Sequence, residues 1–258
     1  MTEDKKTKLR RYVENLYPPL LTLVFLLVGW ECIVRTFHVS KVVLPPPSDI
    51  IRETTRYFSS DILPGWLVTV RTMSVGYLSG VPAGIILASV MSQSRFLIKA
   101  LVPYIVLLVT LPMMVVVPIF MVWAGYDVKY RAILSFVQVT AIIALNTLSG
   151  FRNISQSKLD LAAGYGATRL QTFLKVIFPN ALPEVFQGLR LGCTFSILNA
   201  IGIEFIAGKI GMGFSVQYFS SMLKTAIAFG CIFTVGLTGR LMFMIVEILQ
   251  KLIVTWER

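Results

Sequence analysis

The chain has 258 residues, of which 55% are apolar and only 14% are charged. Soluble domains carry about 25% charged residues, so this composition excludes a water-soluble globular protein and indicates that lipid is the main solvent. The 24 basic and 13 acidic side chains give a formal charge of +11, which in a soluble protein would suggest nucleic-acid binding. Here the basic residues sit at the ends of apolar runs, without interleaved aromatic residues, so we expect no nucleic-acid partner.

The apolar runs are continuous and do not alternate with polar residues, which favours membrane-spanning helices over a β-barrel. A helix needs about 20 apolar residues to cross a bilayer. Six runs approach or exceed this length: 20–37, 67–91, 101–123, 133–148, 189–206 and 227–249. The sequence therefore predicts an all-α, polytopic membrane protein with six transmembrane helices, in which residues 1–258 form a single domain.

The distribution of basic residues predicts the orientation of these helices. With the N-terminus inside, thirteen basic side chains fall on the inner side and eight on the outer side, and a basic cluster precedes the first run. Six crossings then place both termini inside. The first run could also be a signal peptide, but Glu31 and Arg35 follow its apolar part and no A-x-A-like cleavage site is present, so we expect it to remain.

A short helix is expected over residues 49–59, after the first run. Pro45, Pro46 and Pro47 predict an extended stretch, and Ser48 is a candidate cap for the helix. Its apolar side would contain Ile50, Thr54, Tyr57 and Phe58. An amphipathic helix of this kind lies on a membrane surface, here the outer one, although a docking surface for a partner is an alternative.

The second run contains Gly76, Gly80 and Gly84 at intervals of four residues, which makes one side of the helix nearly flat. Such faces allow helices to approach closely in lipid, so we predict that this side lies inside the bundle. Pro82, Pro112 and Pro118 lie within the second and third runs, where neighbouring helices must compensate the backbone hydrogen bonds that proline removes.

The three cysteines, Cys32, Cys193 and Cys231, are isolated within predicted spans and show no C-x-x-C spacing. We interpret them as small apolar fillers, with no disulfide and no metal site. The only histidine, His38, lies alone outside the spans, so a membrane-embedded enzyme with a cluster of catalytic groups is not expected.

Between Phe151 and Gly188 the chain leaves the membrane on the predicted inner side, over a stretch too long for a simple turn. Residues around Leu159 to Tyr165 suit a short helix that Gly164 and Gly166 would end. Thr168 and Gln171 have the spacing of a capping box. The second helix would carry Leu170, Phe173, Leu174 and Ile177 on its apolar side and stop at Pro179. We therefore predict two short helices joined by a turn at Gly166, which requires a backbone conformation that other residues rarely adopt.

This stretch resembles the EAA loop of binding-protein-dependent ABC transporter permeases. Asp160 stands where the family usually has glutamate, Leu161 and Ala162 stand for its two alanines, Gly166 and Ala167 match its glycine turn, and Pro179 and Pro183 match its distal prolines. In that family these positions couple the permease to its ATPase. The changes at Asp160 and Leu161 leave open which ATPase fits.

The resemblance extends over nearly the whole chain. Leu44–Ser48, Leu111–Gly125 and Glu204–Gly213 are similar to the branch that imports nitrate, sulfonates, taurine and some vitamin precursors. The resemblance implies a MetI-like bundle with cytoplasmic coupling helices, located in the bacterial plasma (inner) membrane. It also implies alternating access, a second permease chain, most simply an identical one, and an extracellular or periplasmic substrate-binding protein.

The chain lacks a G-x-x-x-x-G-K-[ST] loop, and its nearest approach is Gly208 and Lys209 followed by Ile210. We therefore expect ATP and Mg²⁺ to bind a partner ATPase, with no cofactor, metal or catalytic residue on this chain. It would be a transport subunit and not an enzyme.

Candidate residues for the solute path are the polar or polarizable ones near predicted spans: Arg71, Met113, Met114, Asn199 and Glu204. Each has a simpler explanation, since Glu204 could anchor a helix end, Arg71 could reach the interface and the methionines could fill space. Two rival functions stay open. An ion-coupled carrier or channel would normally have charged residues deep in its spans, which are scarce here, and a membrane scaffold would not need the glycine-turn loop.

Overall fold

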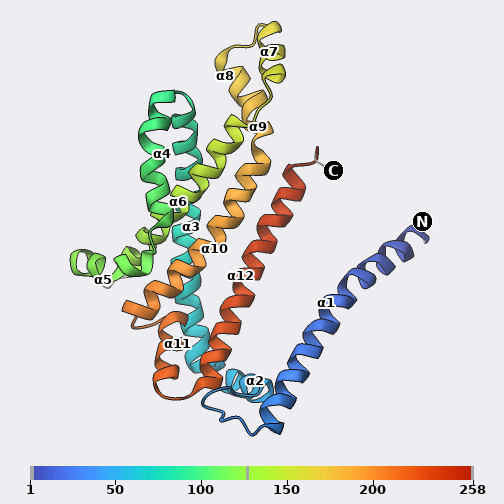
Figure 1. Cartoon of the computed structure of the whole chain (residues 1–258), viewed down its shortest axis with the longest axis vertical. Coiled ribbons are helices and arrows are strands. Elements are labelled where there is room, and N and C mark those ends of the chain that lie inside the picture. Colours follow the sequence, from blue (N-terminus) through green and yellow to red (C-terminus); the bar gives the residue numbers. More distant parts are fainter. Residues whose placement is uncertain (1–2, 126–127, 257–258) are drawn as a thin grey trace.

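The computed structural model describes residues 3–125 and 128–256, and in these ranges the chain is helical, without β-strands (Figure 1). The helices in chain order are α1 Glu3–Thr36, α2 Pro47–Arg56, α3 Leu63–Ser92, α4 Arg95–Thr110, α5 Met113–Ala124, α6 Val128–Arg152, α7 Gln156–Gly164, α8 Arg169–Thr172, α9 Phe178–Asn180, α10 Leu182–Ala207, α11 Met212–Ser221 and α12 Thr225–Ile253. Two π-helical turns, Phe58–Ile62 and Phe173–Ile177, precede α3 and α9. The predicted all-α fold is confirmed.

Within the described residues, five stretches are long and apolar enough to cross a membrane: Tyr17–Thr36, Phe58–Ser92, Tyr130–Arg152, Leu182–Ala207 and Thr225–Ile253. They correspond to the first, second, fourth, fifth and sixth predicted spans. The third predicted span differs, because α4 and α5 meet at a bend of 95° and count as a crossing only when taken together.

The bend between α4 and α5 has a local cause. Leu111 has an extended backbone, with ψ of 121°, and Pro112 follows it. The proline ring disfavours the helical conformation for the residue before it, so the helix ends at Thr110 and restarts at Met113. The third predicted span, over residues 101–123, is therefore not one continuous helix but two helices that meet at the bend. Pro82 and Pro118, in contrast, lie inside α3 and α5.

The centre of the bundle is formed by α3, α6 and α10, which run side by side in Figure 1. The three glycines of α3 face α6. A Cβ atom added at Gly76 would lie 2.6 Å from Ser135 Cβ, one at Gly80 2.8 Å from Val139 Cγ1, and one at Gly84 2.8 Å from Ile143 Cβ. The predicted small-residue face is thus confirmed, because only glycine permits this approach.

Helix α1 stands apart from this centre and contacts the rest of the chain mainly through α2. Ser48 donates a hydrogen bond to Glu31 Oε1 over 2.7 Å, which ties the two helices together. Ser48 does not cap α2, which begins one residue earlier, at Pro47. The apolar side of α2 packs on α12, where Ile50 is buried and Thr54 lies against Gly230. This contact explains why α2 is amphipathic.

The three cysteines are free. Cys193 and Cys231 are buried among apolar neighbours in the bundle, whereas Cys32 is exposed on α1. The predicted filler role therefore fits two of the three cysteines.

Candidate coupling loop and solute-path residues

The segment between α6 and α10 extends beyond the end of the bundle (Figure 1, yellow) and contains α7, α8 and α9. We call residues 153–181 the projecting loop. It joins two of the three central helices directly, since α6 ends at Arg152 and α10 begins at Leu182. Any displacement of the loop is therefore transmitted first to α6 and α10.

The first half of the projecting loop ends in a left-handed turn. The Gly166 N–H donates to Ala163 O over 2.9 Å and the Ala167 N–H donates to Ala162 O over 3.0 Å, which is the Schellman pattern at the end of α7. Gly166 has φ of +68°. In this conformation a side chain with a Cβ costs about 1–2 kcal/mol, so the predicted need for glycine is confirmed.

The second half of the loop begins with a reciprocal capping box. The Gln171 N–H donates to Thr168 Oγ1 over 3.3 Å, and the Thr168 N–H donates to Gln171 Oε1 over 2.9 Å. Both bonds match the sequence prediction. The helix does not stop at Pro179, however. It continues through α9 to Asn180, because Pro179 and Pro183 occupy the first turns of α9 and α10, where a missing N–H is tolerated.

The apolar residues of the second half do not share one environment. Phe173 faces the bundle, with its ring centroid 5.3 Å from that of Phe151, and Ile177 packs in the same cluster. Leu170 and Leu174 are 67% and 56% exposed. The single apolar side expected from the sequence is therefore divided into an attached part and an exposed part.

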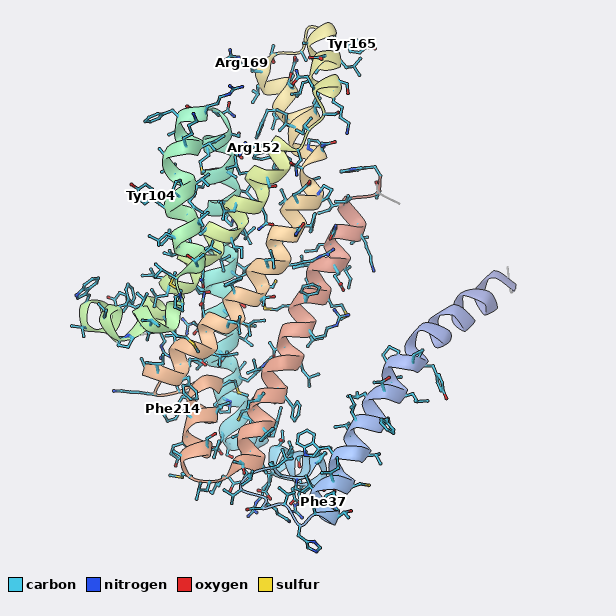
Figure 2. All side chains as sticks on the ribbon, in the orientation of Figure 1. Phe37, Tyr104, Arg152, Tyr165, Arg169 and Phe214 are labelled. Carbon is cyan, nitrogen blue, oxygen red and sulfur yellow. The ribbon has the colours of Figure 1, made fainter. Side chains whose placement is uncertain are left out.

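Two residues of the first half extend the exposed part. Leu161 is 62% exposed and Tyr165 is 83% exposed, and Figure 2 shows Tyr165 pointing away from the tip of the projecting loop. We refer to Leu161, Tyr165, Leu170 and Leu174 as the outer apolar surface. Exposed apolar side chains gathered at a projecting tip are typical of a surface that binds another protein.

The remaining predicted coupling residues have different surroundings, and Pro183 already belongs to α10. Asp160 is exposed and accepts a hydrogen bond from Gln156 Nε2 over 2.9 Å, whereas Ala162 is buried on the other side of α7. Lys158 donates a hydrogen bond to Asn180 Oδ1, which ties the two halves of the loop together. The loop is thus braced by its own contacts.

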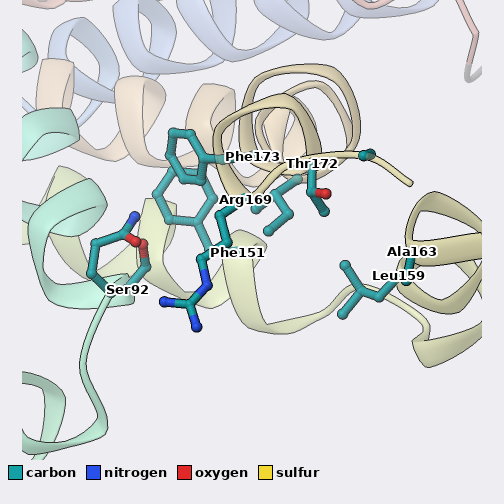
Figure 3. Close-up of a pocket in the computed structure, with 10 residues that line it drawn as sticks. Ser92, Phe151, Leu159, Ala163, Arg169, Thr172 and Phe173 are labelled. Carbon is teal, nitrogen blue, oxygen red and sulfur yellow. The ribbon is translucent and has the colours of Figure 1, made fainter. Parts of the chain in front are cut away.

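A cavity of about 560 Å³ separates part of the loop from the turn between α3 and α4. In Figure 3, Leu159 and Ala163 of α7 line one side of it, and Arg169 extends toward Ser92 on the other. The loop therefore meets the bundle mainly through the aromatic cluster at Phe151, not along its whole length. With this arrangement the loop can move as a unit about its attachment near Phe151.

The candidate solute-path residues are not gathered in one place. Met113 is buried with Val117 and Ile203, whereas Met114 is 47% exposed and lies against Gly202 of α10. Arg71 is exposed on α3. In the described part of the chain no group of three or more His, Cys, Asp or Glu side chains could hold a metal ion.

Asn199 is buried and belongs to a polar chain that the sequence reasoning missed. Its Nδ2 donates to Gln138 Oε1 over 2.8 Å, and Gln138 Nε2 donates to Val109 O over 3.2 Å and to Leu111 O over 3.1 Å. The two carbonyls belong to the end of α4. A lone glutamine within an apolar run was the available signal for Gln138, because such a residue in a span must find partners.

Glu204 is fully buried and anchors α11. Its Oε2 accepts hydrogen bonds from Thr69 Oγ1 over 2.6 Å and from the Gly213 N–H over 3.2 Å. The Met212 N–H donates to Thr69 Oγ1 over 2.8 Å, so both side chains cap the start of α11. A carboxylate at a helix N-terminus is favourable, and the geometry supports the anchoring alternative for Glu204.

Residues 80–258 match the model of a protein family described as "Binding-protein-dependent transport system inner membrane component". Three curated proteins illustrate the similarity. The formylaminopyrimidine transport permease ThiX of Halalkalibacterium halodurans is 26% identical over 93% of this chain and 96% of its own. The taurine transport permease TauC of Escherichia coli is 25% identical over 92% and 88%. The nitrate import permease NrtB of Synechocystis is 25% identical over 96% and 92%.

The fold is also similar to solved ABC transporters. A structure titled as an amino acid ABC transporter with histidines aligns with a TM-score of 0.59, at 17% identity, over 80% of this chain and 96% of that chain. The MetNI methionine ABC transporter aligns with a TM-score of 0.50, at 16% identity, over 72% and 94%.

Proposed function

Because this chain belongs to the family of binding-protein-dependent transport system inner membrane components, we propose that its projecting loop couples it to a separate ATPase subunit. Family membership makes the chain a multi-pass inner membrane permease subunit of an importer for a small solute, and not an enzyme. The proposal goes further in three respects: the coupling role of the loop, the identity of the solute and the composition of the transporter complex.

The observation that carries the coupling role is the outer apolar surface. Leu161, Tyr165, Leu170 and Leu174 are all more than half exposed on the projecting loop, beyond the end of the bundle. Leucine and tyrosine side chains expose apolar area to water here, and burying this area against a protein partner would be favourable. Because the loop is braced by the capping box and the Lys158 contact, it can transmit a movement instead of absorbing it.

We propose that two copies of the permease form a homodimer and that ATP-driven closure of two ATPase subunits rocks α6 and α10, giving alternating access. ATP and Mg²⁺ would be held by the ATPase. The loop and both termini would lie in the cytoplasm, and an extracellular or periplasmic binding protein would deliver the solute to the opposite face. The excess of basic residues on the loop side supports this orientation.

For the solute, we propose a small anion such as nitrate or a sulfonate like taurine, or a vitamin precursor. This class follows from the names of the similar permeases, which transport formylaminopyrimidine, taurine and nitrate. Met113, Asn199 and Glu204 are buried, so Met114 and Arg71 are the accessible residues among the predicted path residues.

Affinity purification of the full chain from gentle detergent tests the coupling role. We expect an ATPase subunit to accompany the unaltered chain and to be lost when Gly166→Val and Asp160→Asn are combined. A chain with Gly164→Val is the control, because Gly164 lies in open space and lacks a positive φ. Retention of the ATPase by the double variant would contradict the coupling role of the loop, and its absence from the unaltered chain would contradict the proposed ATPase partner.

A further inference from the structure

The break between α4 and α5 leaves backbone carbonyls without helical partners. Where a helix ends at Thr110, the preceding carbonyls lose the N–H groups that would have followed in a continuous helix. In lipid an unsatisfied backbone group of this kind is strongly unfavourable, because no water is present to bind it. The break therefore persists only if something else in the bundle donates to these carbonyls.

Gln138 supplies the donors. Its side-chain amide has two hydrogens, and its nitrogen lies 3.2 Å from Val109 O and 3.1 Å from Leu111 O. Gln138 is on α6 and is only 3% exposed. One side chain of α6 thus binds two carbonyls at the end of α4, directly before the bend.

Asn199 on α10 completes the arrangement. It is 6% exposed, and its amide donates to Gln138 Oε1 over 2.8 Å, which fixes the orientation of the glutamine. Helix α10 also supports α5 directly, since Met114 packs on Gly202 and Met113 packs with Ile203. The position of α5 therefore depends on both α6 and α10.

These are the two helices that the projecting loop joins. A relative movement of α6 and α10 would change the Asn199–Gln138 contact and the support of α5 together. Packed elements of this kind have discrete arrangements and do not deform continuously, so a shift at the loop end can reach the break.

We propose that Gln138 and Asn199 are positioning residues of transport, which set the angle of the α4–α5 break and pass the movement of α6 and α10 to α5. The first part stands on the hydrogen bonds alone. The second part rests on the proposed function of the loop. The alternative is a purely structural role, in which Gln138 and Asn199 satisfy buried polar groups and stabilise the bundle without controlling the angle between α4 and α5.

The angle is measured with spin labels at Tyr104 on α4 and Val122 on α5, in a background without native cysteines, using double electron–electron resonance. Both positions are exposed, at 68% and 83%, and Figure 2 shows Tyr104 pointing away from the bundle. Gln138→Met keeps the length of the side chain but removes both donors. We expect a shifted or broadened distance distribution in this variant, and a smaller effect in Asn199→Leu, which removes only the orienting amide.

The matched control is Ser135→Ala, which removes the buried Ser135–Ser196 hydrogen bond of 3.3 Å between the same two helices, one turn from Gln138. A structural effect on the α6–α10 contact would appear in both variants, whereas control of the angle appears only in Gln138→Met. Unchanged distances in Gln138→Met, or equal changes in both variants, would overturn the first part.

The second part is measured on the complex with its ATPase, with and without ATP and vanadate. We expect the label distance to shift on trapping in the unaltered chain and in Ser135→Ala, and the shift to be lost in Gln138→Met. An ATPase that binds and traps without any shift in the unaltered chain would overturn this part and leave the proposed function intact. A chain that binds no ATPase would overturn the second part together with the proposed function of the loop. The distance measurement without nucleotide would still decide the first part.

Discussion

Gly84 of α3 and Gly166 of the projecting loop are both indispensable by our reasoning, but for opposite reasons. A Cβ at Gly84 would lie 2.8 Å from Ile143 Cβ and from Thr140 O, whereas one at Gly166 would meet nothing within 4 Å. What restricts Gly166 is its φ of +68°. The bundle is thus specified by close packing between helices, and the loop by its own backbone conformation and caps.

The apolar side chains of the two regions show the same contrast. Leu78 of α3 and Leu237 of α12 are exposed on the sides of the bundle, where lipid can cover them. Leu161 and Leu170 are exposed on a loop beyond the spans, where the ATPase partner that we propose would cover them. Changes in the bundle should therefore affect folding, and changes in the loop should affect coupling in a bundle that remains folded.

The largest effect is expected for Gly84→Leu. The added side chain would overlap Ile143 and Thr140 across the α3–α6 contact, so we expect a loss of about 3 kcal/mol or more of stability and little folded protein. Thermal unfolding in detergent measures this, with Gly236→Leu on α12 as the control, because its Cβ would meet nothing within 4 Å. Equal unfolding temperatures for the two variants would show that the packing of α3 on α6 is looser than described.

Glu204→Ala should destabilise the bundle by about 1–3 kcal/mol, because it leaves the Gly213 N–H buried without its acceptor, whereas the Thr69 hydroxyl can still donate to Gly65 O over 3.1 Å. Glu204→Gln keeps one acceptor oxygen and should lose less than half as much. Together, Glu204→Ala and Glu204→Gln distinguish a structural role of Glu204 as an anchor of α11 from a role in the solute path. If Glu204→Gln abolished transport at unchanged thermal stability, anchoring of α11 alone would not explain the loss, and Glu204 would be assigned to the solute path.

Gly166→Ala should cost about 1–2 kcal/mol in backbone strain, confined to the loop. We expect the unfolding temperature of the bundle to stay within error while ATPase retention falls about tenfold, the ratio that corresponds to 1.4 kcal/mol. Gly164→Ala is the matched control, because Gly164 has equally open surroundings but an ordinary φ. A similar fall in retention for both variants would mean that added volume, and not conformation, disturbs the loop.

What the sequence could and could not predict follows the same division. The glycine face of α3, the turn at Gly166 and the Thr168 capping box depend on residues close in sequence, and all three were predicted correctly. The bend after Leu111 also has a local cause, in Pro112. It was not predicted, because a continuous apolar run is compatible with both a straight and a broken helix. The partners of Glu204 and Asn199 could not be predicted, since they lie on other helices: Thr69 is 135 residues away and Gln138 is 61.

The smallest effect is expected for Thr168→Ala, and it tests whether the loop is stiff because of its caps. Thr168 makes both bonds of the capping box, whereas Ser155, at the start of α7, makes no side-chain capping bond. Loss of such a cap costs about 1 kcal/mol, so amide hydrogen exchange in α8 should accelerate roughly fivefold in Thr168→Ala and stay unchanged in Ser155→Ala. If the ATPase is still retained but its nucleotide cycle drives transport less efficiently, stiffness matters separately from binding. Accelerated exchange with fully efficient transport would mean that the outer apolar surface, once bound, orders the loop without help from its caps.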